Sequence, residues 1–238
     1  MGLLYYKFSL RELKMTTNLW QRISKVAEFF ESRFRETGTP IVDVAESYDW
    51  YNRLYTSSTY RRAHVEIVDK TASHKILVLH CVVFPHYNDP SPIWGFDAVC
   101  GPNKITGAFH DFSNGGDPDH FMMKHFAETV KDVTWNKPRV LPQWASEIFS
   151  SNIVAAGNVS DEAELDNLCQ LAESNLDYYL NNVGKTAQSE IDYWPIQSRY
   201  NANNKLNPHV ARSMISMGVE EAVIKKFIDE VLYPEHRL

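Results

Sequence analysis

Hydrophobic and polar residues follow two different periodicities along this chain of 238 residues. Between Leu19 and Phe34 the apolar residues recur at helical spacing with charged residues between them, which predicts an amphipathic helix. The middle of the chain contains short β-rich runs, three of which are separated by clear turn signals. These runs cover residues 60–69, 75–85, 93–101 and 104–112. Because the links between the runs are short, the pattern predicts an antiparallel meander.

The run from Ile76 to Phe84 is apolar at both odd and even positions, so both faces of this strand are expected to be covered. Helices must therefore pack on both sides of the sheet. No repeat, low-complexity tract or linker divides the chain, and the Asn-rich stretch near residue 204 is predicted to be a loop. We expect one domain over residues 15–238, preceded by an N-terminal extension over residues 1–14.

The C-terminal third supplies the required helices. One is predicted with Ser160 as its N-cap, acidic residues in its first turn and an apolar face that continues to Tyr179. Two more are predicted over residues 189–201 and 219–232. Pro195 is expected to kink the first of these or to delay its start.

Composition and charge narrow the class of protein. The formal net charge of −6 argues against nucleic acid as a partner. Cys81, Cys100 and Cys169 lie far apart without metal-ligand spacing, so they are expected to be reduced packing residues. No apolar run reaches the roughly 20 residues of a membrane span, and the N-terminus lacks a secretory signal. The sequence thus predicts a cytoplasmic protein without a membrane partner.

Four ionisable residues stand inside the predicted strands. His64 and Glu66 are two residues apart and share a strand face, and His80 and Asp97 lie on the next two strands. A lone buried histidine is more often a polar group satisfied by the backbone. A set of two histidines and two carboxyl groups on consecutive strands instead favours proton-transfer chemistry, because burial and coupling shift their pKa values. Signatures of nucleotide, hydrolase and zinc-protease sites are missing from the sequence.

The segments "RRAHVE", "LHCVVFP", "GFDAVCGP" and "LPQWASEIFS" resemble the core motifs of the ferredoxin-dependent bilin reductases, specifically the phycocyanobilin:ferredoxin oxidoreductase branch. The spacing of 17 residues between His80 and Asp97 also matches that branch. The resemblance implies an α/β/α sandwich of three layers, with a central antiparallel sheet and helices on both faces. It implies biliverdin IXα as substrate, reduced ferredoxin as external electron donor, no bound cofactor or metal, and a monomer.

The resemblance also implies roles for individual residues. Asp97 matches the aspartate that protonates the bilin, and His80 matches the histidine that contacts the same part of the bilin. His64 matches a partner behind that histidine, and Glu66 matches the glutamate that serves reduction of the D-ring vinyl group.

Substrate-binding residues follow from the same resemblance. Arg139 matches an anchor for a propionate, and Thr106 falls at a hydroxyl position near a propionate. Asn207 occupies a position where relatives carry a proton-donating aspartate, and Pro208 follows where a lysine can bind a propionate. This departure resembles a phage-associated offshoot of the branch that makes phycoerythrobilin through 15,16-dihydrobiliverdin. Glu66 instead favours phycocyanobilin, so both products stay open, with phycoerythrobilin preferred.

Two other interpretations of the function stand beside that of an enzyme. A bilin carrier would use the same pocket but would need no proton donor, and a plain α/β protein with a satisfied polar core would not bind bilin. For the acidic partner ferredoxin, the basic residues at strand ends are candidates for a docking patch, although such residues are more often simply solvated. They are Arg61, Arg62, Lys70, Lys75 and Lys104.

Overall fold

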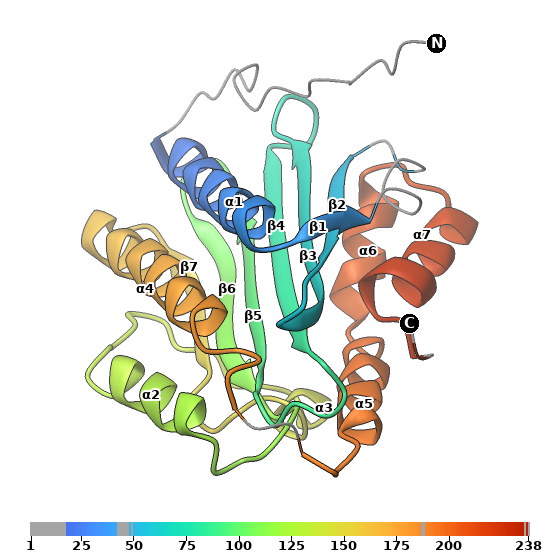
Figure 1. Cartoon of the computed structure of the whole chain (residues 1–238). Helices are drawn as coiled ribbons and strands as arrows, with labels where there is room; N and C mark the ends of the chain where they lie inside the picture. The colour runs from blue at the N-terminus through green and yellow to red at the C-terminus, as the bar shows by residue number, and fades with distance from the viewer. Residues whose placement is uncertain (1–17, 42–47, 49, 187–188, 236, 238) are drawn as a thin grey trace.

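Seven strands form one antiparallel sheet in which the strands lie side by side in chain order (Figure 1). The computed structural model describes residues 18–238 except 42–47, 49, 187–188, 236 and 238. The strands are β1 (Thr39–Ile41), β2 (Tyr51–Thr56), β3 (Tyr60–Lys70), β4 (Ile76–Pro85), β5 (Ile93–Cys100), β6 (Ile105–Ser113) and β7 (Val154–Val159). The four predicted β-rich runs are β3 to β6, so the predicted meander is confirmed. The predicted N-terminal extension lies outside the described residues.

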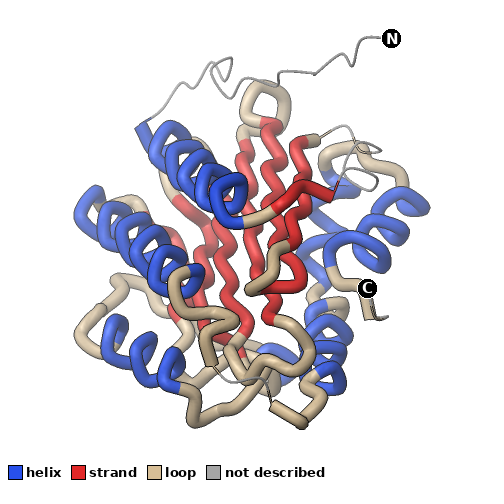
Figure 2. The backbone as a smooth tube through the Cα atoms, in the orientation of Figure 1, coloured by secondary structure: helices blue, strands red, loops and turns tan. Residues whose placement is uncertain are grey.

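Helices cover both faces of the sheet, which confirms the predicted three-layer arrangement (Figure 2). The helices are α1 (Asn18–Thr37), α2 (Phe121–Val130), α3 (Gln143–Ser146), α4 (Glu162–Leu180), α5 (Trp194–Asn204), α6 (Pro208–Ser216), α7 (Glu221–Phe227) and the π-helix η3 (Ile228–Leu232). Helices α1, α2 and α4 pack on one face of the sheet, and the C-terminal helices pack on the other. None of the helices in the described part has the length and apolarity needed to cross a membrane.

The face under α1 and α4 is the larger hydrophobic core. Its residues come from alternate positions of the strands, as the two-residue period of a strand requires. Phe30 of α1 lies edge-on to two strand residues, with ring centroids 5.2 Å from Trp94 and 5.5 Å from Phe96. This packing accounts for the helical spacing of apolar residues that predicts α1.

The opposite face carries two smaller apolar clusters and a polar interior. Trp50 and Leu54 from the β2 region pack with Met214 of α6 and Phe227 of α7. The Trp50 and Phe227 rings meet edge-on at 5.0 Å. Apolar packing under α6 and α7 therefore covers one end of this face, and the ionisable residues lie beside it.

Three predicted helix boundaries are corrected by the structure. The N-cap of α4 is Asp161, whose carboxylate accepts a hydrogen bond from Glu164 N at 3.0 Å, so Ser160 lies one position outside. The helix predicted from residue 189 begins at Trp194, because Pro195 fits the first turn of a helix and lacks the N–H needed further inside. The helix predicted over residues 219–232 is α7 followed by η3, and it begins at Glu221.

Several elements carry no strong pattern and were not predicted: β1, β2, β7, α2, α3 and α6. The predicted loop near residue 204 is only partly correct, because α5 continues to Asn204 and α6 begins at Pro208. Asn207 caps α6 by accepting from His209 N at 3.0 Å, with Pro208 in the first turn. An Asn-Pro pair is a recognised start of a helix, so the sequence did contain this signal.

The corrected cap of α4 can be tested by comparing two neighbouring alanine variants. Asp161→Ala is expected to lower the free energy of unfolding by about 1 kcal/mol, because it leaves the Glu164 N–H without its partner. Ser160→Ala is the matched control and should leave stability within about 0.5 kcal/mol of the unsubstituted protein. Urea denaturation followed by circular dichroism measures both. A larger loss in Ser160→Ala would restore the cap predicted from the sequence.

Candidate active site

The register of the sheet places four polar side chains in a row across four neighbouring strands. Asn52 of β2 is paired with Glu66 of β3, Glu66 with His80 of β4, and His80 with Asp97 of β5. Directly paired residues point to the same face of a sheet, and His64 joins them because it lies two residues before Glu66. The structure therefore brings together all four residues predicted for proton transfer.

A hydrogen bond links the two strands at the exposed end of this row. His80 Nδ1 lies 2.7 Å from Asp97 Oδ1. The His80 side chain is only 8% exposed, whereas that of Asp97 is 43% exposed. Burial opposes a charge on His80, but the Asp97 carboxylate outweighs this effect and raises the pKa of the histidine. Asp97 thus faces the outside with a buried proton donor directly behind it.

His64 lies deeper in the same layer and is held by Asn52. The Nε2 atom of His64 is hydrogen-bonded to Asn52 Oδ1, and both residues are fully buried. Burial, together with the nearby positive charges of Arg62 and His80, holds the pKa of His64 well below its usual range. The His64 and His80 rings are perpendicular neighbours with centroids 5.5 Å apart. At neutral pH His64 is therefore an uncharged imidazole next to a protonatable one.

Glu66 is a buried carboxyl group with an unusual proton affinity. Burial raises the pKa of Glu66 to about 7, although His80 and Trp50 act in the opposite direction. Near neutral pH a large fraction of this carboxyl group therefore carries a proton. A carboxylic acid in this state can donate that proton to a substrate.

The predicted docking patch is wrong at Arg62, which is buried. Its side chain is only 2% exposed and lies under η3, where an Nη2 hydrogen bond reaches the carbonyl oxygen of Val231. Burial lowers the pKa of Arg62 to about 9, so the guanidinium stays charged at neutral pH. Arg61 is also engaged, because its Nε donates to Gln197 at 2.9 Å. Neither arginine forms a solvated surface charge, whereas Lys75 and Lys104 are exposed.

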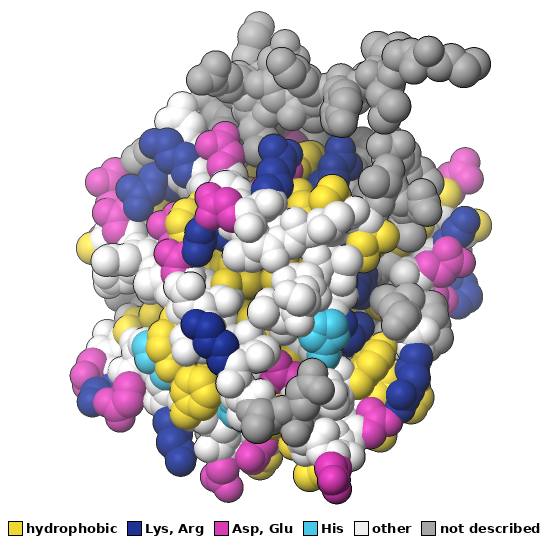
Figure 3. All heavy atoms as spheres, in the orientation of Figure 1, with side chains coloured by type: hydrophobic (Ala, Val, Ile, Leu, Met, Phe, Trp, Pro, Cys, Tyr) yellow, Lys and Arg dark blue, Asp and Glu magenta, His cyan; other side chains and the backbone are white. Residues whose placement is uncertain are grey.

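Acidic and basic side chains are interspersed on the face of the molecule that carries α1 and α4 (Figure 3). Ion pairs there join α1 to α4, with Arg22 Nη2 2.5 Å from Asp166 and Arg33 Nε 2.6 Å from Asp177. Arg22 and Arg33 of α1 are therefore paired with negative charges of α4.

Arg139 lies on β6 and β7 because two glycines leave room for it. A Cβ atom at Gly157 would come within 2.8 Å of Arg139 Nε, and one at Gly107 within 3.7 Å of the guanidinium. The two glycines are paired, and Gly107 is also paired with Val99, two residues beyond Asp97. Arg139 thus covers the same sheet face as Asp97 and is exposed to solvent.

The other two predicted binding residues make local contacts. The Thr106 hydroxyl donates to the Val99 carbonyl at 3.0 Å, and the Thr106 carbonyl accepts a hydrogen bond from Arg139 Nη2. Asn207 uses its side-chain oxygen to cap α6. Within the described residues, Asn207 has no hydrogen bond to the His80–Asp97 pair, so the structure does not join it to the polar row.

Sequence reasoning missed the aromatic and amide residues around this row. Tyr233 follows η3 and places its ring 6.2 Å from that of His80, and Phe227 places its ring 6.4 Å from that of His64. Burial raises the pKa of Tyr233 well above its usual value, with the charges of Asp97 and Glu66 adding to the effect. Asn52 is the third missed residue. No strong signal marks Asn52 in the sequence, because β2 also contains the polar residues Arg53 and Thr56.

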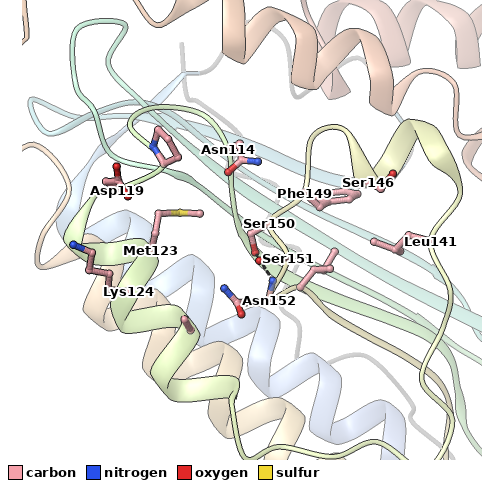
Figure 4. A pocket seen from close by; sticks show the side chains of 13 residues that line it. Asn114, Asp119, Met123, Lys124, Leu141, Ser146, Phe149, Ser150, Ser151 and Asn152 are labelled. Atoms are coloured by element: carbon pink, nitrogen blue, oxygen red, sulfur yellow. Dashed lines mark hydrogen bonds between the residues drawn. The ribbon is translucent and has the colours of Figure 1, made fainter.

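A hollow of about 750 Å³ lies elsewhere, between α2 and the segment from Leu141 to Ile153 (Figure 4). Asp119, Met123 and Lys124 line one side, and Phe149 and Ser150 line the other. None of the predicted site residues lines this hollow. Its walls contain no buried polar side chain lacking a partner in the described region, so the polar row remains the better candidate for chemistry.

Known proteins match most of this chain. The family model described as ferredoxin-dependent bilin reductase matches residues 14–234. A phycocyanobilin:ferredoxin oxidoreductase of Prochlorococcus marinus (strain MIT 9515) is 25% identical over 76% of this chain and 73% of the relative. Another with the same name, from Trichodesmium erythraeum (strain IMS101), is 35% identical over 42% of this chain and 40% of the relative.

Two solved structures share the fold. A PcyX structure superposes with a TM-score of 0.64 at 24% identity and covers 90% of this chain and 99% of that chain. The phytochromobilin synthase of tomato, solved in complex with biliverdin, superposes with a TM-score of 0.66 at 13% identity and covers 90% of this chain and 82% of that chain.

The match over residues 14–234 defines the class as oxidoreductases that act on bilins. The chain belongs to the ferredoxin-dependent bilin reductase family. It is therefore an enzyme that takes electrons from ferredoxin, and among curated proteins it is related to phycocyanobilin:ferredoxin oxidoreductases.

The buried carboxyl of Glu66 has a consequence for stability. Its pKa is raised in the folded state to about 7, so the folded protein retains a proton that the unfolded chain has lost, and stability falls as pH rises from about 4.5 to 7. Glu66→Gln removes this loss. The free energy of unfolding of the variant, relative to that of the unsubstituted protein, is therefore expected to rise by up to about 3 kcal/mol between pH 5 and pH 8. Urea unfolding at several pH values measures the difference, and a constant difference would contradict the raised pKa.

Proposed function

We propose that this chain reduces biliverdin IXα to a phycobilin in two steps of two electrons each, with Asp97 as the first proton donor. The supporting observation is the Asp97–His80 hydrogen bond at the boundary between a buried polar row and solvent. A bilin lying on the exposed carboxylate would meet a proton donor that is resupplied from the interior. The conjugated bilin accepts the electrons itself, so no additional redox group is needed in the protein.

Proton and electron transfers balance in this scheme. Ferredoxin delivers one electron to the bound bilin, and the proton on Nδ1 of protonated His80 passes through the Asp97 carboxyl group to the resulting bilin radical anion. This leaves His80 neutral, and His80 takes up a proton that comes ultimately from solvent before the next step. Four electrons and four protons complete the conversion of biliverdin to a phycobilin. His64 supports His80 from behind and does not contact the substrate in this proposal.

Glu66 is the second proton donor in the proposed reaction. Its pKa of about 7 keeps a proton available at neutral pH, which general acid catalysis requires. It lies on the strand next to His80, on the far side from Asp97. Two donors on either side of one histidine can protonate two different parts of one extended bilin. This arrangement supports assigning Glu66 to the D-ring vinyl group.

Arg139 and Thr106 are the proposed contacts to a propionate. The Arg139 guanidinium lies over two glycines on the sheet face that carries Asp97 and is accessible from outside. Its planar fork suits a carboxylate. Thr106 places its backbone carbonyl on the same guanidinium, which orients the arginine toward the substrate side. Asn207 is proposed to line the substrate from the start of α6, where its side-chain oxygen already caps the helix.

Phycoerythrobilin, formed through 15,16-dihydrobiliverdin, is the preferred product. Asn207 stands where relatives carry a proton-donating aspartate, and this departure resembles the offshoot of the branch that makes phycoerythrobilin. Phycocyanobilin is the competing product because Glu66 is present and well placed. Anaerobic assays with reduced ferredoxin and liquid chromatography of the bilins distinguish the two. Detection of phycocyanobilin alone would reject the preferred product and leave the reductase assignment intact.

A bilin carrier is the alternative from another class. A carrier would bind biliverdin and leave its absorption spectrum unchanged after reduced ferredoxin is added. The buried His80 behind an exposed carboxylate favours the enzyme, because holding a pigment requires neither a proton donor nor its resupply.

Replacing the proposed donor separates proton transfer from electron transfer. Asp97→Asn preserves the size of the side chain, so biliverdin should still bind and the first electron should still arrive. Without the proton, the bilin radical should persist, and the rate of its decay should fall by about 10²- to 10⁴-fold. Absorption and electron paramagnetic resonance spectroscopy under anaerobic conditions follow the radical.

The matched control is Asp119→Asn, which removes an exposed carboxylate from the hollow beside α2. This variant should turn over at the normal rate. Full activity of Asp97→Asn would reject the catalytic assignment. Loss of biliverdin binding in the same variant would instead indicate a structural role for Asp97.

A further inference from the structure

Asn52 is a buried amide at the inner end of the polar row. It lies on β2 opposite Glu66, is completely buried, and bonds through Oδ1 to His64 Nε2. The other half of its amide, Nδ2, is buried and has no partner within the described residues. A residue retained only for packing would be apolar, because an unpaired buried amide N–H is unfavourable. The arrangement therefore points to a specific task for the oxygen atom.

The bond between Asn52 and His64 determines where the His64 proton resides. A carbonyl oxygen can only accept a hydrogen bond, so His64 Nε2 must carry the hydrogen. His64 is neutral, because burial and the charges of Arg62 and His80 disfavour its cation. A neutral imidazole with a protonated Nε2 has a bare lone pair on Nδ1. Nδ1 is buried and, like His80 Nε2, has no partner in the described part of the chain.

These two nitrogens belong to neighbouring imidazole rings, and their hydrogen-bonding character is opposite when His80 is protonated. When His80 is protonated, its Nδ1–H faces Asp97 and its Nε2–H needs an acceptor. The two nitrogens are not hydrogen-bonded to each other in this structure, but a bare Nδ1 gives His64 a lone pair on a ring whose centroid is 5.5 Å from that of His80. The opposite tautomer of His64 would present an N–H to another N–H and would disfavour the protonated form of His80. The state of His64 therefore influences how readily His80 holds the proton intended for Asp97.

We propose that Asn52 is a positioning residue that fixes His64 in the tautomer protonated on Nε2, so that Nδ1 keeps a lone pair and presents no N–H to protonated His80. This assignment rests on the proposed role of the His80–Asp97 pair in bilin reduction. The groups that face His64 are Asn52 from β2, Arg62 on its own strand, His80 from β4 and the Phe227 ring from α7. Among them, only Asn52 offers an oxygen to the imidazole.

The tautomer itself can be measured without substrate. Nitrogen-15 NMR of the histidine side chains distinguishes a protonated ring nitrogen from a bare one. In the unsubstituted protein, His64 should show a protonated Nε2 and a bare Nδ1. Asn52→Leu removes the acceptor at nearly constant volume and should give a mixture of tautomers. A native His64 protonated on Nδ1, or an unchanged spectrum in Asn52→Leu, would overturn the proposal.

Two further variants distinguish the loss of the Asn52 acceptor from a general disturbance of the strand. Asn52→Asp retains an acceptor oxygen but adds a charge, so His64 should become an imidazolium near neutral pH and return to the Nε2-protonated neutral form at alkaline pH. Tyr51→Phe changes the adjacent residue of the same strand, which points to the opposite face of the sheet, and should leave the His64 signals unchanged. A matching spectral change in Tyr51→Phe would assign the effect to the strand and overturn the role of Asn52.

Decay of the bilin radical connects the tautomer to the reaction. With biliverdin and reduced ferredoxin, Asn52→Leu should slow radical decay about tenfold at every pH, as is common when a partner that orients a histidine is removed. Asn52→Asp should recover the native rate at alkaline pH, where His64 is again neutral. Equal rates in all variants would overturn the proposal. If the unsubstituted protein does not reduce biliverdin at all, the proposed function fails, while the NMR spectra still decide the tautomer.

Discussion

The hydrogen bond between His80 and Asp97 joins two neighbouring strands, and it depends on the register of the sheet. Side chains alternate between the two faces of a strand, so a slip of one residue would move Asp97 into the core beneath α1 and bring Phe96 to the polar face. The dense aromatic packing of Phe96 and Trp94 against Phe30 opposes such a slip. Apolar packing on one face thus secures the position of the proposed proton donors on the other.

The polar row needs the C-terminal helices as well as the sheet. Burial raises the pKa of Glu66 and lowers that of His64, and the Phe227 ring of α7 lies against His64 as part of this cover. The same cover stops short of Asp97, whose side chain stays partly exposed. The row therefore runs from a buried interior to an accessible surface, and the proposed proton transfer from His80 to Asp97 follows the same direction. A carrier would have no use for this arrangement.

The predicted elements agree with the structure where the apolar residues recur regularly along a short segment of the chain. The strong periodicity of α1 and of β3 to β6 predicted these elements correctly, because apolar residues recur wherever a buried face recurs. β2 and β7 are short strands without a strong pattern, and residues such as Leu54 pack against helices distant in the chain. α6 is also short and begins next to an Asn-rich stretch. The prediction that Arg62 lies on the surface is wrong for a related reason. An arginine at the start of a strand resembles a surface charge until η3, more than 160 residues later, covers it.

By itself the sequence determined the meander, the helices on both sides and the four ionisable residues on consecutive strands. Strand periodicity decides which side chains share a face, and the short links decide which strands are neighbours. Only the tertiary structure decided that His80 bonds to Asp97 and that Asn52 holds His64. It also showed that Asn207 caps a helix and that two glycines make room for Arg139. These contacts depend on distances between atoms of different strands and helices, and those distances are set by the packing of the whole chain.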